Sequence, residues 1–113
     1  MQDCIFCKII DHKIPSTIVF ENKDMIVIND IAPKAPIHYL IMPKKHIKDV
    51  QSITKEDADV LSGMFYIAQE ISKKNEKAAD FKLVINSGYN AGQRVFHLHM
   101  HMLAGKMISA SEI

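Results

Sequence analysis

The stretch that decides the fold runs Val95-Phe96-His97-Leu98-His99-Met100-His101-Met102-Leu103, in which every second residue from 97 to 101 is a histidine. Such alternation is typical of a β-strand, where side chains two positions apart share one face. Neighbouring histidines then lie about 6.6 Å apart, at roughly 3.3 Å of rise per residue. The pattern predicts a strand over 95–103 with three imidazoles on one wall. The residues left for the packing side are Val95, Leu98, Met100 and Met102.

Three histidines on one face of a strand have three interpretations. The first is an ordinary half-exposed strand whose polar positions are histidines. The second is a metal site, because imidazole is a common metal ligand and alternate strand positions can converge on one ion. The third is nucleophilic catalysis, in which one histidine attacks a substrate while its neighbours hold or polarise it. Because half of the chain's six histidines fall within five positions, a chemical role is favoured.

The same stretch resembles a known family. The run from His97 to Leu103 matches the His-x-His-x-His-x-x signature, with x apolar, of the histidine triad nucleotide-binding proteins. Further stretches resemble that family in its order along the chain: Asp30 to His38, Ile41 to His46 and Gly92 to Phe96. The chain is most similar to the Hint-like branch, and within it to bacterial-type members with an N-terminal Cys-x-x-Cys.

The composition is typical of a soluble globular protein. With 113 residues, of which 48% are apolar and 24% charged, the chain is expected to form a single domain over 1–113. A net charge of +1 offers no basic surface for a nucleic acid polymer or an anionic membrane, so any phosphate binding has to be local. We find no secretory signal and no apolar run near the roughly 20 residues of a membrane span, and we expect a cytoplasmic protein.

Local patterns predict the other elements. A short helix over 5–10 precedes Pro15, and two strands over 17–21 and 25–29 form a hairpin. A third strand over 38–42 stops at Pro43. Apolar residues at three- and four-residue steps predict one long helix over 54–77, capped by Thr54, and a fourth strand follows over 81–86. This order predicts an α+β fold, a five-stranded antiparallel sheet with one long helix and a short N-terminal helix, as the histidine triad fold also implies.

The resemblance implies a reaction at phosphorus. Attack by an imidazole gives a phosphoramidate that water then hydrolyses, so one hard displacement becomes two easier ones. The middle histidine, His99, is implied as the nucleophile, with its tautomer held by an adjacent backbone carbonyl. His101 is implied to stabilise charge on the phosphate oxygens, and His38 to support the triad. No catalytic metal is required.

The resemblance also implies where a nucleotide binds. Taken alone, Asp30 is either a turn-former or an acceptor for ribose hydroxyls, and the loop over 86–93 is either a plain connection or a phosphate-binding loop. The family favours the second reading of each. Arg94, where many relatives carry serine, either contacts a phosphate or turns to solvent. The implied base slot is Phe6, Ile9 and Ile14, the ribose site is Ile28, Asp30 and Ile31, and the phosphate side is Asn86, Gly92 and Gln93, with His99 and His101.

Cys4 and Cys7 form a Cys-x-x-Cys pair, which indicates metal or redox chemistry. A redox pair is disfavoured because no thioredoxin-like strand and helix precede it. A structural zinc site needs four ligands, and relatives with this cysteine pair imply His46 and His97 as the other two. The alternative is two reduced, buried cysteines.

Together these features predict a purine nucleotide hydrolase or transferase that acts at the α-phosphorus, with an adenosine 5′-phosphoramidate as substrate. The alternatives are a dinucleoside polyphosphate hydrolase, a module that binds a mononucleotide with incidental turnover, and a purely structural zinc domain. The resemblance further implies a homodimer that joins two sheets. The tail over 104–113 lacks the tryptophan-proline ending of eukaryotic relatives, which leaves the substrate specificity open.

Overall fold

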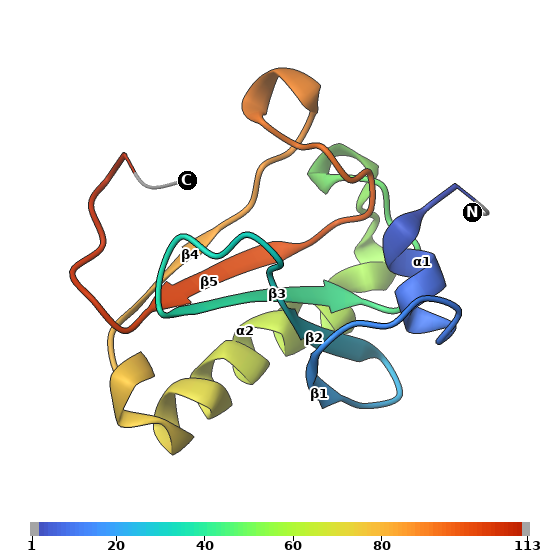
Figure 1. Ribbon diagram of the computed structural model, residues 1–113. Coiled ribbons are helices and arrows are strands. Elements are labelled where there is room, and N and C mark those ends of the chain that lie inside the picture. Colours follow the sequence, from blue (N-terminus) through green and yellow to red (C-terminus); the bar gives the residue numbers. More distant parts are fainter. Residues whose placement is uncertain (1–2, 112–113) are drawn as a thin grey trace.

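The computed structural model describes residues 3–111, so Met1, Gln2 and the last two residues of the tail lie outside the described part. The expected order of short helix, three strands, long helix and two strands is confirmed (Figure 1). The elements are α1 (Ile5–Ile10), β1 (Ile18–Glu21), β2 (Met25–Asn29), β3 (Ile37–Pro43), α2 (Ala58–Lys74), β4 (Phe81–Val84) and β5 (Met100–Ala104). Short 3-10 turns lie at Val50–Ser52, Lys55–Asp57, Glu76–Ala78 and Tyr89–Ala91.

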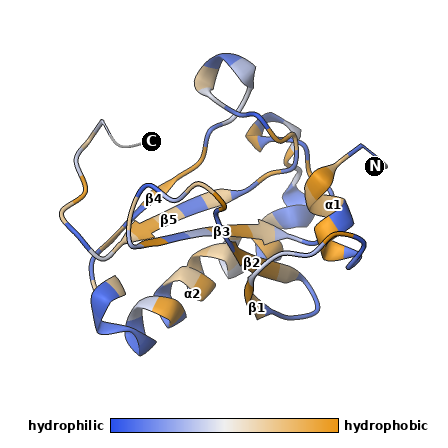
Figure 2. Cartoon of the chain, viewed as in Figure 1, coloured by the Kyte–Doolittle hydropathy of each residue, from blue (hydrophilic) through white to orange (hydrophobic). Residues whose placement is uncertain are grey.

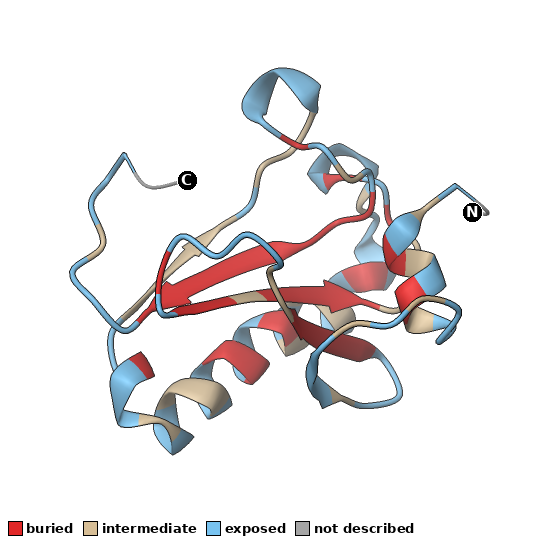
Figure 3. Ribbon diagram, viewed as in Figure 1, coloured by how far each residue is buried: buried red, intermediate tan, exposed pale blue. Residues whose placement is uncertain are grey.

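The strands form one antiparallel sheet in the order β1-β2-β3-β5-β4, which confirms the predicted α+β class. The β1–β2 hairpin turns at Asn22, whose side-chain oxygen accepts the backbone N–H groups of Asp24 and Met25. β3 lies at the centre, between β2 and β5, and is buried over most of its length (Figure 3). β1 and β4 are the two edge strands.

Alternation along the strands divides the core into two faces. Met25 and Val27 pack on the α2 side, whereas Ile26 and Ile28 pack on the α1 side. α2 lies along one face of the sheet (Figure 1), and its end is hydrophilic (Figure 2) at Lys73 and Lys74. α1 has only six residues, so it covers one part of the other face. The remainder of that face forms the floor of the cavity described below.

The predicted strand over 95–103 is wrong in its first half. β5 begins at Met100, which pairs with Ile41 of β3. The ladder between β3 and β5 stops at this pair, although β3 continues to Pro43. Residues 95–97 form a bend, and the N–H of Leu98 donates instead to the carbonyl of Ile47 at 2.7 Å. The histidines therefore alternate along an irregular segment that leads into a strand.

Two further expectations need correction. Val95 does not pack with Leu98, Met100 and Met102 on the α2 side; it packs against the cluster that contains Phe6. Odd and even positions of an alternating segment face opposite sides. Position 95 therefore lies on the side of position 97, away from positions 98, 100 and 102. The long helix is also shorter than predicted, since α2 covers Ala58–Lys74 and the flanking turns are of the 3-10 type. Thr54 still begins this region, where its backbone N–H donates to the Asp57 carboxylate at 2.9 Å.

No helix within residues 3–111 is long and apolar enough to cross a membrane.

Candidate active site and metal centre

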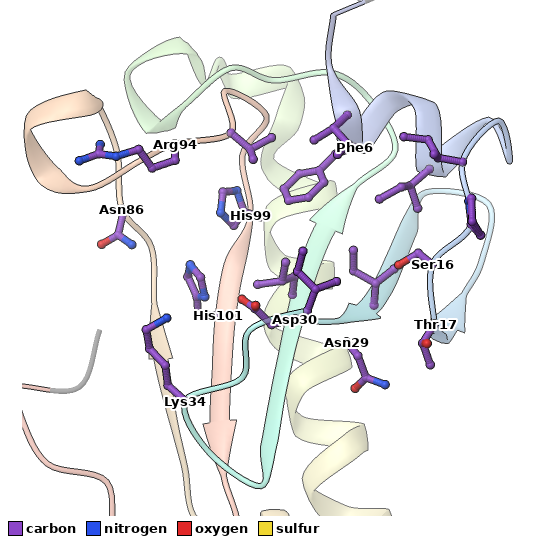
Figure 4. Close-up of a pocket in the computed structure, with 18 of the residues that line it drawn as sticks. Phe6, Ser16, Thr17, Asn29, Asp30, Lys34, Asn86, Arg94, His99 and His101 are labelled. Atoms are coloured by element: carbon purple, nitrogen blue, oxygen red, sulfur yellow. The ribbon is translucent and has the colours of Figure 1, made fainter.

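A cavity of about 860 Å³ lies on the face of the sheet that α1 partly covers. It is lined by every predicted nucleotide-binding residue except Gln93: Phe6, Ile9, Ile14, Ile28, Asp30, Ile31, Asn86, Gly92, Arg94, His99 and His101. Figure 4 shows Phe6 on one side of His99, and Asn86 and Arg94 on the other. The cavity thus has an apolar end under α1 and a polar end beside the loop over 86–94.

His99 is held by a bond to its own segment. Its Nδ1 lies 2.7 Å from the backbone carbonyl oxygen of His97. A carbonyl can only accept, so we place the proton on Nδ1, and Nε2 keeps its lone pair. The edge of Phe6 packs against the ring, with centroids 5.0 Å apart. Burial lowers the pKa of His99, so the ring is neutral at neutral pH and carries a nitrogen nucleophile.

His101 takes the opposite tautomer because of a relay from the connector between β2 and β3. The backbone N–H of Lys34 donates to Nδ1 of His38 at 3.1 Å, so His38 carries its proton on Nε2. That Nε2 lies 2.9 Å from Nδ1 of His101. His101 therefore accepts at Nδ1 and keeps an N–H donor at Nε2. Burial lowers the pKa of His101 to about 4 and also lowers that of His38.

His38 does not line the cavity, whereas His99 and His101 do. The His99 and His101 rings are 5.2 Å apart, centroid to centroid. The site therefore presents an imidazole lone pair and an imidazole N–H donor side by side. His38 contacts the second of these rings and has no surface on the cavity.

Asp30 closes a turn and is also within the cavity lining. Its Oδ1 accepts the N–H of Ala32 at 2.8 Å, which closes a turn, and its Oδ2 lies 3.4 Å from Nε2 of His38. The residue also lines the cavity. Because 3.4 Å is longer than the His38–His101 distance, the His38 proton is directed mainly to His101.

Gln93 lies in a different place from the one expected. Its side chain is 1% exposed, and its amide donates to the carbonyls of Lys48 and Val95 at 2.8 and 3.1 Å. Its Oε1 accepts the N–H of Gly88 at 2.8 Å. All of these bonds stay within the protein, so Gln93 shapes the loop. The sequence offers no signal for this, because a glutamine after a glycine does not show which way its amide points.

Gly92 and Arg94 complete the loop. Gly92 has a φ of +104°, a left-handed conformation that favours glycine, and it lies beside the Asn86 side chain. Arg94 is exposed and lines the cavity, and its guanidinium is held by its own loop. Its Nη1 donates to the carbonyls of Tyr89 and Gln93 at 2.8 and 3.0 Å, and its guanidinium lies 4.1 Å from the centre of the Tyr89 ring.

The cysteine–histidine cluster (Cys4, Cys7, His46 and His97) forms a second centre, with its ligand atoms all within 4.8 Å of one another. Nε2 of His97 lies 2.7 Å from the carbonyl oxygen of Pro43, so the proton belongs on Nε2 and the Nδ1 lone pair faces the cluster. Nδ1 of His97 lies 3.2 Å from Nδ1 of His46 and 3.6 Å from each sulfur, and Cys7 Sγ lies 3.3 Å from His46 Nδ1.

These spacings fit a tetrahedral ion. With metal–sulfur bonds of about 2.3 Å and metal–nitrogen bonds of about 2.0–2.1 Å, tetrahedral ligand atoms lie about 3.3 to 3.8 Å apart. Burial raises the pKa of the Cys7 thiol to about 11, and the neighbouring Cys4 adds to this effect. A cation at the centre would favour the thiolates instead. The four residues are therefore close enough to hold a metal ion.

The comparisons agree with this fold. The family described as "Scavenger mRNA decapping enzyme C-term binding" matches residues 3–112. A HIT-like protein of Synechocystis is 40% identical over 108 residues, which cover 96% of this chain and 95% of that protein. The solved HIT family hydrolase of Legionella pneumophila has a TM-score of 0.91 and 36% identity, with 97% and 99% of the two chains covered. A histidine triad protein of Clostridium difficile has a TM-score of 0.92 and 39% identity, with 99% and 98% covered.

The chain therefore belongs to the histidine triad (HIT) family and has the fold of its hydrolases.

Proposed function

We propose that this protein cleaves purine nucleotide derivatives at the α-phosphorus, with adenosine 5′-phosphoramidates as its preferred substrates. The single observation that carries the proposal is the complementary pair on the cavity wall. His99 offers a lone pair at Nε2, and His101 offers an N–H donor. A nucleophile next to a donor for the phosphate oxygens is what displacement at phosphorus requires.

The proposed reaction has two displacements at the same phosphorus. Nε2 of His99 attacks the α-phosphorus, the phosphorus–nitrogen bond breaks, and the amine leaves with a proton taken from solvent. The N–H of His101 stabilises charge on the non-bridging oxygens as it develops. Water then attacks the nucleotidyl-His99 intermediate and returns one proton to solvent, which releases adenosine monophosphate and restores the neutral imidazole. His38 keeps His101 in the donor tautomer.

The two ends of the cavity support a purine nucleotide as the ligand. Phe6, Ile9 and Ile14 form an apolar slot suited to a flat base, and Asp30 beside Ile28 and Ile31 supplies a carboxylate for the ribose hydroxyls. Asn86 and Gly92 lie at the polar end, where the leaving group would depart. The cavity is large enough for a nucleotide.

The cysteine–histidine cluster is proposed to hold structural zinc. Two thiols and two imidazoles in a small, tetrahedral arrangement are the donors that zinc selects. The ion would join α1, which carries Cys7, to the irregular segment before β5, which carries His97. Cys4 lies just before that helix, as its N-cap. The zinc takes no part in the proposed reaction.

A homodimer is proposed through the β4 edge. β4 pairs with β5 on one side only, and Ile85 just beyond it is 37% exposed. Tyr66 and Glu70 of α2 line a groove together with Phe20 of β1. The side of the helix that carries Tyr66 and Glu70 therefore faces the β1 edge of the sheet. Phe65, 55% exposed, lies about 100° around the helix from Tyr66 and so on the β4 flank. Within residues 3–111 no other strand pairs with the outer side of β4, and such an edge with apolar side chains beside it suits a second copy.

The test uses an adenosine 5′-phosphoramidate with a fluorescent amine and three proteins: the parent, His99→Ala and His12→Ala. His12 is an exposed histidine outside the cavity, so its variant is the matched control. We expect release by the parent and the His12 variant, and a loss of at least 1,000-fold in the His99 variant, on the order of that for a lost nucleophile. Quenching the parent reaction in alkaline denaturant should trap an adenylyl group on His99, because the phosphorus–nitrogen bond survives alkali and is hydrolysed by acid. Equal release by His99→Ala would refute the mechanism.

A further inference from the structure

The polar end of the cavity contains a cation that the proposed reaction does not use. Lys34 lies on the connector between β2 and β3 and lines the cavity. Figure 4 shows its side chain beside His101, across the cavity from Phe6. A base in the apolar slot and a phosphate at His99 would therefore leave Lys34 facing whatever is attached beyond the phosphate.

The ammonium of Lys34 is not neutralised by the protein. Among residues 3–111 it makes no ion pair. Asp30, an acid that lines the same cavity, directs one oxygen to the N–H of Ala32 and the other toward His38. The charge of Lys34 contributes to the lowered pKa values of His101 and His38, which agrees with its position at the polar end.

Arg94, the other cation that lines the cavity, is engaged elsewhere. Its guanidinium stacks on Tyr89 and donates to two carbonyls of its own loop. Within the described residues the side chain of Lys34 has no such bonds, while its backbone is held in place. Pro33 restricts the chain on one side, and the N–H of Lys34 donates to His38. The site thus combines a fixed backbone with an ammonium on a flexible stem.

We propose that Lys34 is a specificity-determining residue that selects leaving groups with a negative charge, a carboxylate or a phosphate, close to the atom bonded to the α-phosphorus. This inference rests on the proposed function, because it assigns the leaving group of the same reaction. The preference should be modest, about five- to tenfold, because the ammonium is exposed and water screens its field.

The first experiment compares two adenosine 5′-phosphoramidates of the same shape, one made from β-alanine and one from its amide. The ratio of their kcat/KM values is measured for the parent, for Lys34→Gln and for Lys34→Arg. Both variants keep the backbone N–H that orients His38. We expect the parent to prefer the carboxylate substrate five- to tenfold, the Gln variant to bring the ratio close to one, and the Arg variant to keep the preference. High salt should reduce the parent's ratio in the same direction.

The second experiment needs no turnover. Binding of adenosine diphosphate and adenosine monophosphate is measured by calorimetry in the His99→Ala background, with and without Lys34→Gln. Loss of the lysine should weaken the diphosphate about fivefold more than the monophosphate. A response to the carboxylate alone assigns a carboxylate leaving group, and a response to the diphosphate alone assigns a phosphate.

Two outcomes would overturn the inference. One is that Lys34→Gln leaves both the carboxylate-to-amide ratio and the diphosphate-to-monophosphate ratio unaltered. The other is that it lowers all ligands equally, which indicates a structural effect through His38. Failure of the parent to cleave either phosphoramidate would instead refute the proposed function, and the binding ratio would still decide the role of Lys34.

Discussion

Nδ1 of His99 lies 2.7 Å from the backbone carbonyl of His97, two residues earlier in the chain. This bond links the two centres of the molecule. The ring of His97 faces the two cysteines, and its carbonyl fixes the tautomer of the ring that faces the cavity. Two successive peptide units therefore join the cysteine–histidine cluster to the candidate nucleophile.

Removing the donor on His38 should slow turnover without weakening binding. In His38→Leu, nothing donates to Nδ1 of His101, so His101 loses its preference for the donor tautomer. We expect kcat to fall about 10- to 100-fold, in the range seen when one stabilising donor is lost, with KM within about twofold. His38→Gln can still place an N–H near the position of Nε2 and should lose less. Steady-state kinetics of both variants checks this, and a kcat within twofold of the parent for His38→Leu would contradict it.

The pH dependence of kcat/KM should follow the neutral form of His99. Burial lowers the pKa of this imidazole below its usual value of 6.5. Because only the unprotonated ring can attack, the rate is full above the lowered pKa and is lost as the pH falls through it. We therefore expect no decline between pH 8 and 6.5 and an acid limb below that. A limb centred at or above pH 6.5 would show that His99 is not the buried neutral group described.

Loss of a ligand from the cysteine–histidine cluster should lower both the zinc content and the Tm of the protein. Cys7→Ser should reduce the zinc content of purified protein, measured by mass spectrometry, and lower Tm. A chelator should lower the Tm of the parent toward that of the variant, because a ligand present at 100 times its Kd stabilises by about 2.7 kcal/mol. His12→Asn, which removes a histidine outside the cluster, should change neither quantity. An unaltered Tm in Cys7→Ser and in chelator would refute the structural role.

Gln93→Ala should destabilise the fold. The change leaves two carbonyls and one N–H without the amide that satisfies them. We expect the free energy of unfolding to fall by about 1–3 kcal/mol, the usual result of leaving buried polar groups unpaired. Urea unfolding measures it, and Gln69→Ala, at an exposed position of α2, is the matched control with an expected change within about 0.5 kcal/mol. Equal stability of the two variants would contradict the assigned position.

A charge on the β4 flank of α2 should separate the proposed dimer. Phe65→Glu places a carboxylate against the expected interface, whereas Tyr66→Glu places it on the flank toward β1. Sedimentation velocity should show a dimer for the parent and for Tyr66→Glu, and a monomer or a weaker dimer for Phe65→Glu. A dimer lost only in Tyr66→Glu would move the interface to the β1 side.

Much of the fold follows from periodicity, and so does the gathering of the histidines. Leu98 and Met100 belong to the core on the α2 side, and the three histidines lie on the other side although only His101 is in a strand. The start of β5 was not predictable from this pattern. It depends on contacts between distant segments, such as the bond from the N–H of Leu98 to the carbonyl of Ile47.

The positions of Lys34 and Gln93 also could not be obtained from local sequence. Lys34 reaches the cavity because the connector folds back so that its N–H meets His38, and Gln93 points inward because the carbonyl of Lys48 lies there. Both depend on segments that meet only in the folded chain. Residues on regular strands, such as Ile28, could be placed in advance, since their neighbours follow from the sheet.

The alternation between positions 97 and 101 makes this segment sensitive to length. The imidazole of the cysteine–histidine cluster, the candidate nucleophile and the donor imidazole lie at successive odd positions, and Leu98 and Met100 between them belong to the core on the α2 side. Deletion of one residue here would turn a histidine toward the core and an apolar side chain toward the cavity. A change of one residue in length would therefore abolish both centres at once. Replacing one histidine removes one group. Changing the number of residues exchanges the side chains that face the core with those that face the cavity.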